Sequence, residues 1–306
     1  SSTAPFGLRS KTDNYHASQT YGRSAKVRSI NIAPTIGYQV NDWLAVGAAV
    51  QGQFIKTNLK QATGVTATAP SAILDGDSID FGYRLGVTLT PIKGTTIGVG
   101  YRSSIRQTLE GTFNTGGPGG VLPIKANLNL PDSVVVGLSH QINDQWQAHL
   151  GYEWTNWSRF RNIPIVNKLS GAAFTSLNFQ YDDSHFVSAG VEYRYNRALT
   201  LRAGVGYEWS PVNDRNRTVF ISDNDRLWLG VGGSYQVTEK IKLDLGYSYL
   251  HVKKATVNYG GAHPQQGPIF YQAEAKPHIH IVSAGLTYRW DNPAETLPVA
   301  PVVRKY

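Results

Sequence analysis

Apolar and polar residues alternate along most of this 306-residue chain, and the alternation sets its fold class. From Leu199 to Trp209 the odd positions carry Leu, Ala, Val, Tyr and Trp, whereas the even positions carry Thr, Arg, Gly and Glu. The same pattern recurs at 241–249 and at 282–290. A period of two residues is typical of a β-strand with two unlike faces. The sequence therefore predicts an all-β protein, and no segment predicts a helix.

Eleven strands are predicted in this way. Their ranges are 26–40, 44–61, 78–91, 95–114, 124–142, 146–162, 175–195, 199–212, 225–238, 241–259 and 270–290. Most of them are much longer than the usual strand of about five or six residues. Strands of this length, tilted across a bilayer, suit a membrane barrel.

The connections between these strands alternate in length. Short polar turns occur at 38–43, 140–146, 193–198 and 235–240, and long loops occur near 62–77, 115–123, 163–174, 213–224 and 260–269. Short turns at one end and long loops at the other indicate an antiparallel up-and-down meander. We therefore expect neighbours in sequence to be neighbours in the sheet.

The polar face of the predicted strands lacks the dense charge of a water-exposed surface. On 78–91 and 95–114 it carries Gly, Ser and scattered charges, including Arg84 and Arg102, which suits a crowded, wet lumen. Aromatic residues such as Trp43 lie near strand ends, where their rings fit a lipid interface. We predict a transmembrane antiparallel up-and-down β-barrel with its apolar face, including Leu201 and Val205, toward lipid. The alternative is a large soluble β-sandwich.

Composition excludes several classes of protein. The longest apolar runs have seven residues, as at 44–50, whereas a membrane-spanning helix needs about 20. The absence of Cys removes disulfides and thiol chemistry. His278 and His280 share one strand face without a third ligand, so we predict no metal and no cofactor. No Gly-x-Ser-x-Gly motif is present, so we predict no enzyme.

The formal net charge of +8 comes from dispersed basic residues. Their densest cluster is Lys253-Lys254, and no nucleic-acid motif accompanies it, so we expect no nucleic-acid partner. Anionic lipopolysaccharide and outer-membrane lipid, or an anionic ligand, are better partners for such a charge.

One long motif carries a family resemblance. Residues 210–228, Ser-Pro-Val-Asn-Asp-Arg-Asn-Arg-Thr-Val-Phe-Ile-Ser-Asp-Asn-Asp-Arg-Leu-Trp, resemble the SPV...R...IPDxDRxW signature of the FadL family of outer-membrane long-chain fatty acid and hydrocarbon channels. The segments 128–132, 152–158 and 5–8 resemble the same family. Ser222 stands where the family usually has Pro.

The resemblance implies a barrel of fourteen strands with an N-terminal hatch. Residues 5–8 resemble the end of the family's third strand, so we expect three strands and the hatch to lie upstream of Ser1. The eleven strands counted above would then complete an even total. We expect residues 1–290 to form the barrel wall and 291–306 a periplasmic tail, in a multi-pass monomer of the Gram-negative outer membrane.

The resemblance also implies passive uptake of a long-chain fatty acid or another hydrophobic small molecule. Buried carboxylates need a partner, and Arg can hold one through two parallel hydrogen bonds. The candidate ligand-binding residues are Arg217 and Arg226, from the signature, and Arg84, Arg102 and Arg202, from the lumen-facing positions. For each of them a structural ion pair is the alternative, with Asp223 and Asp225 close to the signature arginines.

Two other functions remain open at the level of sequence. A water-filled porin for small polar solutes would suit the polar lumen, which by itself gives no sign of an apolar conduit. A structural or adhesive surface protein acting through the long loops is the other possibility. Only the family resemblance favours a channel for hydrophobic compounds.

Overall fold

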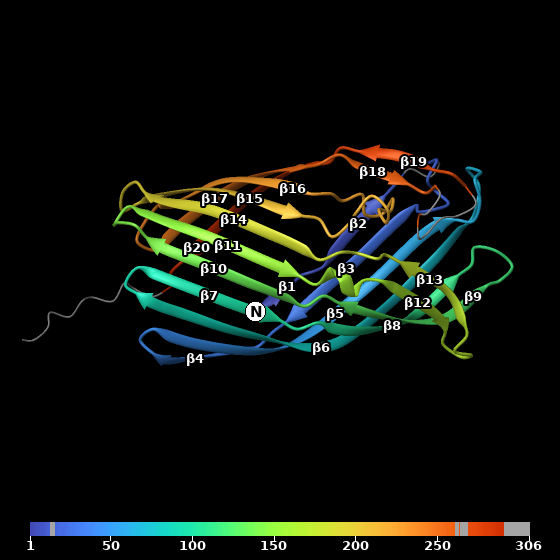
Figure 1. The fold of residues 1–306 in the computed structure, drawn as a ribbon, viewed down its shortest axis with the longest axis horizontal. Coiled ribbons are helices and arrows are strands. Elements are labelled where there is room, and N and C mark those ends of the chain that lie inside the picture. The colour runs from blue at the N-terminus through green and yellow to red at the C-terminus, as the bar shows by residue number, and fades with distance from the viewer. Residues whose placement is uncertain (13–15, 261–262, 264–268, 291–306) are drawn as a thin grey trace, which may run out of the picture.

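A computed structural model describes residues 1–12, 16–260, 263 and 269–290, and these residues form almost entirely β-strands (Figure 1). Their one helical element is a 3₁₀ turn, η1 (Trp157–Arg159). No helix in the described ranges is long and apolar enough to cross a membrane. The expected tail at 291–306 lies outside the described residues.

The strands follow one another along the whole chain. They are β1 (Ser2–Thr3), β2 (Gly7–Lys11), β3 (Ser24–Ile32), β4 (Thr35–Asn41), β5 (Leu44–Ala62), β6 (Ser71–Ile92), β7 (Thr95–Arg102), β8 (Ile105–Asn114), β9 (Val121–Leu130), β10 (Ser133–Gln141), β11 (Trp146–Thr155), β12 (Asn162–Asn167), β13 (Ala173–Asn178), β14 (Ser184–Arg194), β15 (Leu199–Trp209), β16 (Arg226–Gln236), β17 (Ile241–Val252), β18 (Ala255–Asn258), β19 (Gln272–Ala275) and β20 (His278–Tyr288).

All eleven predicted strands are confirmed, several of them as two consecutive pieces, such as β3 with β4 and β7 with β8. Three predicted boundaries were wrong. β11 ends at Thr155 and not at residue 162, because the 3₁₀ turn η1 follows it, and β12 occupies part of the predicted loop 163–174. β6 begins at Ser71 and not at residue 78. Its extension pairs with the far end of β5, up to Ala62 opposite Ser71, so the loop between them shortens to residues 63–70. Backbone pairing with β5 therefore continues through a segment whose own alternation is weak.

The sheet is an antiparallel meander, as predicted. Each long strand pairs with the next one, from β3 through β5 and β6 onward to β16, β17 and β20. In Figure 1 the short turns gather at the left end and the long loops at the right end of the wrapped sheet. In the described part of the chain, β20 pairs with β17 alone, so the sheet is open between β20 and the first strands.

The two faces of the sheet are oriented as predicted. Leu201, Val205 and Leu245 are 44%, 48% and 67% exposed on the outer surface. Facing inward, Gln51 is fully buried and accepts a hydrogen bond from Arg84. The apolar face of the strands is therefore the one available to lipid, and the polar face lines the interior.

The alternation changes phase once between β7 and β8. Strand β6 pairs Arg84 with Arg102 of β7, but it pairs Asp77 with Glu110 of β8, which is a register shift of one residue. The shift falls at residues 103–104, which lie between the two strands. An extra residue of this kind acts as a β-bulge, since it turns the following side chains to the opposite face.

The phase change corrects part of the predicted inner face. Even positions up to Arg102 face the interior, as predicted, but beyond the bulge the odd positions do so. Ser103, Ile105 and Gln107 are accordingly 6%, 3% and 0% exposed. Ser104, one of the Ser residues on the polar face predicted for 95–114, lies at the point where the phase changes.

Candidate ligand-binding site

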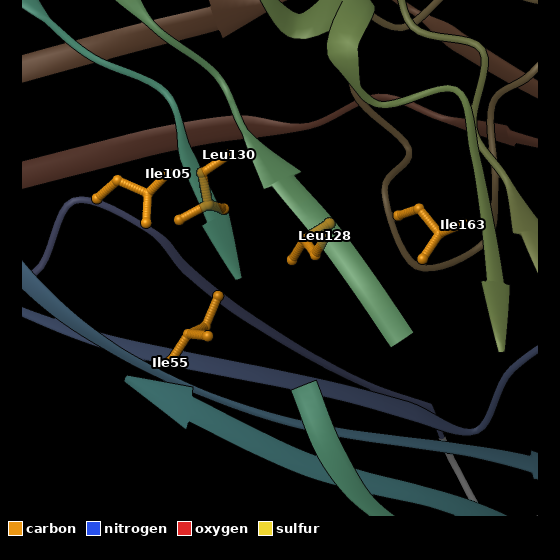
Figure 2. Close-up of a cluster of buried hydrophobic side chains, with 5 residues drawn as sticks. All are labelled: Ile55, Ile105, Leu128, Leu130 and Ile163. Atoms are coloured by element: carbon orange, nitrogen blue, oxygen red, sulfur yellow. The ribbon is translucent and has the colours of Figure 1, made fainter. Parts of the chain in front are cut away.

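An apolar cluster lines the inner face of the sheet in its loop-end half. It consists of Ile55 of β5, Ile105 of β8, Leu128 and Leu130 of β9, and Ile163 of β12 (Figure 2). All are less than 9% exposed, although the sequence predicted a polar lumen. Below this level the inward positions of β5 are Gln51 and Gln53, so the interior changes from polar to apolar along a single strand.

Aromatic rings extend the apolar cluster toward the loops. The ring centroids of Phe6 and Trp157 are 6.0 Å apart, and those of Trp157 and Phe160 are 5.2 Å apart. Tyr181 lies 5.3 Å from Phe179 and is only 6% exposed. Its hydroxyl has no hydrogen-bond partner within the described residues. Burial, and then the nearby Asp223 carboxylate, raise the pKa of Tyr181 far above its ordinary value.

Arg84 belongs to a hydrogen-bonded polar network beneath the apolar cluster. Its Nε donates to Gln51 Oε1 at 3.0 Å, and its Nη2 donates to Asn31 Oδ1 at 2.9 Å. The Asn31 amide in turn donates to the side-chain oxygens of Gln51 and Gln53, both at 3.2 Å. This guanidinium is therefore held in place by neutral amides and carries no acidic partner among the described residues.

Arg102 lies opposite Arg84 in the sheet, at the border between the polar network and the apolar cluster. Its guanidinium carbon is 5.2 Å from the centroid of Phe6, a ring that packs against the apolar cluster. Its buried Nε has no hydrogen-bond partner among the described residues. No carboxylate of those residues forms an ion pair with it, and Glu153 acts on it only as a more distant negative charge. Arg84 and Arg102 are like charges at facing positions, and like charges repel. An anion placed at Arg102 would relieve this repulsion.

The structure places Arg217 in a loop network and not in the lumen. Its side chain is 1% exposed. Nε donates to the Asp223 carbonyl at 2.7 Å, Nη1 donates to the Thr256 carbonyl at 2.9 Å, and Nη1 also forms an ion pair with Asp214. The donors of this arginine are thus used to connect the 210–225 loop to the strand that follows β17.

Aromatic rings from two other loops cover this network. The Tyr21 and Tyr259 rings stack with their centroids 3.8 Å apart, and the Tyr259 hydroxyl accepts a hydrogen bond from the Val219 backbone N–H at 3.1 Å. Burial raises the pKa of Tyr259 to about 12. His263 Nε2 lies 3.0 Å from the Arg217 carbonyl oxygen. Loops from both ends of the chain are therefore joined over the same buried arginine.

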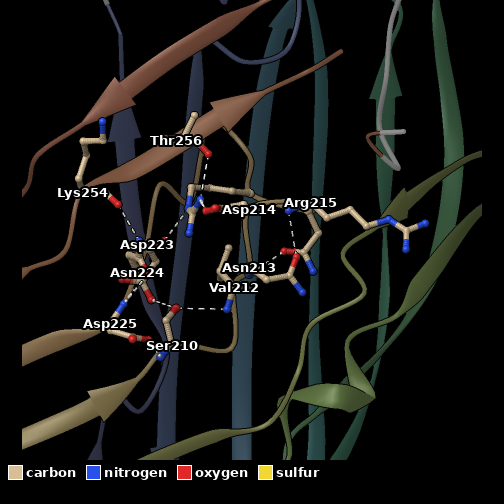
Figure 3. A network of polar contacts seen from close by, with 12 residues as sticks. Ser210, Val212, Asn213, Asp214, Arg215, Asp223, Asn224, Asp225, Lys254 and Thr256 are labelled. Carbon is tan, nitrogen blue, oxygen red and sulfur yellow. Dashed lines mark hydrogen bonds and ion pairs between the residues drawn. The ribbon is translucent and has the colours of Figure 1, made fainter. Parts of the chain in front are cut away.

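Arg226 and Asp223 form a second ion pair at the base of this loop. The Arg226 Nη2 atom lies 2.7 Å from each carboxylate oxygen of Asp223, and its Nε is 3.5 Å from Glu208 Oε2. Asp223 also accepts a hydrogen bond from the Ser210 hydroxyl, as the network in Figure 3 shows. This contact set matches the alternative of a loop-stabilising ion pair, and ligand binding by Arg226 stays a prediction.

Asp225 ends the loop and is held by several donors. Its carboxylate accepts hydrogen bonds from the Ser210 backbone N–H at 3.0 Å, the Tyr207 hydroxyl at 3.0 Å and the Lys253 ammonium at 3.1 Å. Burial tends to raise the pKa of Asp225, but these hydrogen bonds outweigh it and lower the pKa below its ordinary value. The carboxylate is therefore fixed in its charged form.

Arg202 lies apart from the other candidates, near the short turns. It donates to Glu192 Oε2 at 2.7 Å and to Ser234 Oγ at 2.6 Å, and its side chain is 45% exposed. Of the five predicted residues, the structure brings together Arg84 with Arg102, places Arg217 near Arg226 through Asp223, and leaves Arg202 alone.

His278 and His280 are neighbours, with ring centroids 5.7 Å apart, but no metal-binding group is present in the described residues.

Comparisons with known proteins agree with this architecture. Residues 1–291 match the family described as "Outer membrane protein transport protein (OMPP1/FadL/TodX)". The chain is 26% identical to the long-chain fatty acid transport protein of Escherichia coli strain CFT073, over 94% of this chain and 72% of that protein. It is also 26% identical to outer membrane protein P1 of Haemophilus influenzae, over 81% of this chain and 61% of that protein.

Solved structures extend the likeness to the fold. A Pseudomonas aeruginosa FadL homologue superimposes with a TM-score of 0.83 at 23% identity, over 94% of this chain and 73% of that chain. The Pseudomonas putida toluene transporter TodX gives a TM-score of 0.65 at 19% identity, over 95% of this chain and 78% of that chain.

Proposed function

The chain belongs to the outer membrane protein transport family OMPP1/FadL/TodX, and we propose that it admits hydrophobic carboxylates, with long-chain fatty acids as the main class, across the outer membrane. The hydrophobic ligand passes through unchanged, and a single chain supplies every proposed contact. The named relatives are transport proteins, among them long-chain fatty acid and toluene transporters.

The observation that carries this proposal is the position of Arg102. It is a cation that forms no ion pair within the described residues, it faces Arg84, and it touches Phe6 at the edge of the apolar cluster. A carboxylate bound there would gain a charge-assisted hydrogen bond and would separate two like charges. The hydrocarbon tail of the same molecule would pack on the apolar cluster, since burial of apolar surface is favourable.

Binding of a fluorescent long-chain fatty acid and of the matched fatty alcohol, measured on the protein in liposomes, tests this proposal. We expect Arg102→Gln to weaken fatty acid binding by about tenfold to a hundredfold, since a hydrogen bond to a charged group contributes about 1.5–3 kcal/mol. Alcohol binding should change little. Arg106→Gln is the matched control, because Arg106 is an exposed residue of β8 without an ion pair in the described residues.

Equal losses for acid and alcohol would remove Arg102 from carboxylate recognition. Swelling assays with sugars separate the remaining alternative: we expect slow sugar entry, and rapid sugar entry without saturable fatty acid binding would instead establish a porin.

A further inference from the structure

A dense group of cations occupies the outward face of the first strands at the loop end. We call it the basic patch, and it consists of Arg9 and Lys11 of β2, Lys26 and Arg28 of β3, and Lys56 and Lys60 of β5. Lower on the same strands the outward positions are aliphatic, as at Ile30, Ile32 and Val50. The patch therefore lies above the apolar part of the outer surface, and fatty acid passage through the interior does not use it.

Strand register makes these six residues one surface. Arg9 is opposite Lys26, and Arg28 is opposite Lys56, so the members of each pair point to the same side of the sheet. Lys60 and Lys11 are both opposite Ser24 and complete the row toward the loops.

Acidic groups compensate little of this charge. On the neighbouring strand β6, Asp75 and Asp77 are the carboxylates on the same face. Asp75 reaches Lys56 only at 3.9 Å, and the Lys56 side chain remains 51% exposed. In the part of the chain that the structure describes, Arg9, Lys26 and their neighbours in the patch form no other ion pair. The patch therefore keeps an excess of positive charge that can meet an external anion.

The height of the patch on the barrel indicates which anion that is. Ile30, Ile32 and Val50 lie below it on the same strands and are 53%, 60% and 62% exposed. Lys56 follows Leu44, the first residue of β5, by twelve positions. At about 3.3 Å per residue and a tilt of about 40°, this corresponds to about 30 Å along the membrane normal, compared with an apolar band about 25 Å tall. The patch thus lies just beyond the hydrocarbon, at headgroup level.

We propose that the basic patch binds the phosphate groups of lipopolysaccharide in the outer leaflet. Cations on a lipid-facing strand are tolerated at the interface and not at mid-bilayer, and clustered Lys and Arg at a membrane surface attract anionic headgroups. The exposed isoleucines and valine beneath the patch offer the acyl chains of the same molecule a matching apolar surface. One lipid molecule can therefore contact both levels of the wall.

Binding of purified lipid A to the detergent-solubilised protein, in the presence of EDTA and at two salt concentrations, tests this proposal. The patch variant carries Lys26→Gln, Arg28→Gln and Lys56→Gln. The control variant carries Lys93→Gln, Arg197→Gln and Lys240→Gln, which remove the same charge at the short turns on the opposite end. A third variant, with Lys26→Arg, Arg28→Lys and Lys56→Arg, preserves the charge of the patch.

We expect the patch variant to bind diphosphorylated lipid A at least tenfold more weakly than the unchanged protein, with the deficit shrinking at high salt. The control and charge-preserving variants should bind normally, and lipid A without its phosphates should bind all variants equally weakly. Equal losses in the patch and control variants would overturn the proposal, as would undiminished binding of dephosphorylated lipid A. Fatty acid binding by the patch variant reports separately on the lumen.

Discussion

Replacing Arg217 with Ala distinguishes the two roles that the signature motif suggests for this residue. The Arg217 side chain is 1% exposed and donates to the carbonyl oxygens of Asp223 and Thr256. Hydrogen bonds to a charged group contribute about 1.5–3 kcal/mol each, so the two together suggest a loss of about 3–6 kcal/mol. The ion pair with Asp214 adds little, because that carboxylate is 81% exposed and regains water when the arginine is removed.

A loss of this size should open the 210–225 loop without unfolding the barrel, because the strands on either side keep their pairing. Hydrogen exchange of the loop amides measures the effect directly, and we expect much faster exchange in Arg217→Ala. Arg215→Ala is the control, since Arg215 is an exposed arginine two positions away. Unchanged exchange, combined with a selective loss of fatty acid binding, would refute this reasoning and make Arg217 a ligand-binding residue.

Three further sets of changes test the packing of the loops and strands. Tyr181→Phe should leave the melting temperature unchanged or raise it, because its buried hydroxyl lacks a partner among the described residues, whereas Tyr259→Phe should cost about 1 kcal/mol through the lost hydrogen bond. The hydrogen bonds that Asp225 accepts lower its pKa, although burial acts in the opposite direction. Their contribution to the stability of the folded loop is therefore complete above about pH 4 and is lost as pH falls through the lower folded-state pKa. Hydrogen exchange of the loop should show this acid sensitivity, and Asp225→Asn should abolish it. Gly111→Ala should weaken the sheet, since its Cβ would lie 2.0 Å from a backbone oxygen of β6, whereas Gly98→Ala meets nothing within 4 Å and serves as the control in the same thermal melts.

The wall of the barrel could be predicted from the sequence because its strands have two unlike faces. The segments 199–209 and 241–249 alternate without interruption. β15 and β17 both begin where predicted, β15 ends three residues early, and β17 with β18 covers the predicted range 241–259. Side-chain period and strand register are local properties, so a single sequence carries them. The start of β6 at Ser71 was missed because it depends on pairing with β5 and not on its own pattern.

The apolar cluster could not be predicted, for two physical reasons. The bulge at residues 103–104 reverses the phase, so Ile105 faces the interior although the preceding alternation assigns odd positions to lipid. On β5 the inward positions change from Gln53 to Ile55 with no change of period, and only the neighbouring strands decide whether such a change forms a cluster. Both features depend on residues distant in sequence.

The contacts of the candidate arginines were likewise predictable only where they are local in sequence. The pairing of Arg226 with Asp223 joins residues three positions apart, and the sequence offered it as an alternative. The contact between Arg217 and Thr256 spans two loops and has no local signal. That Arg102 forms no ion pair within the described residues is a property of several strands together, and it emerges only when all of them are placed.

The bulge between β7 and β8 determines which side chains of this strand line the channel interior. If the alternation ran on unbroken through residues 103 and 104, Ile105 and Gln107 would face outward and Arg106 would face the interior. The same residues can thus give this strand an apolar or a charged lining, depending only on whether its pairing with β6 is interrupted. Channels of this architecture can therefore change their internal chemistry by gaining or losing a strand interruption as well as through point substitution.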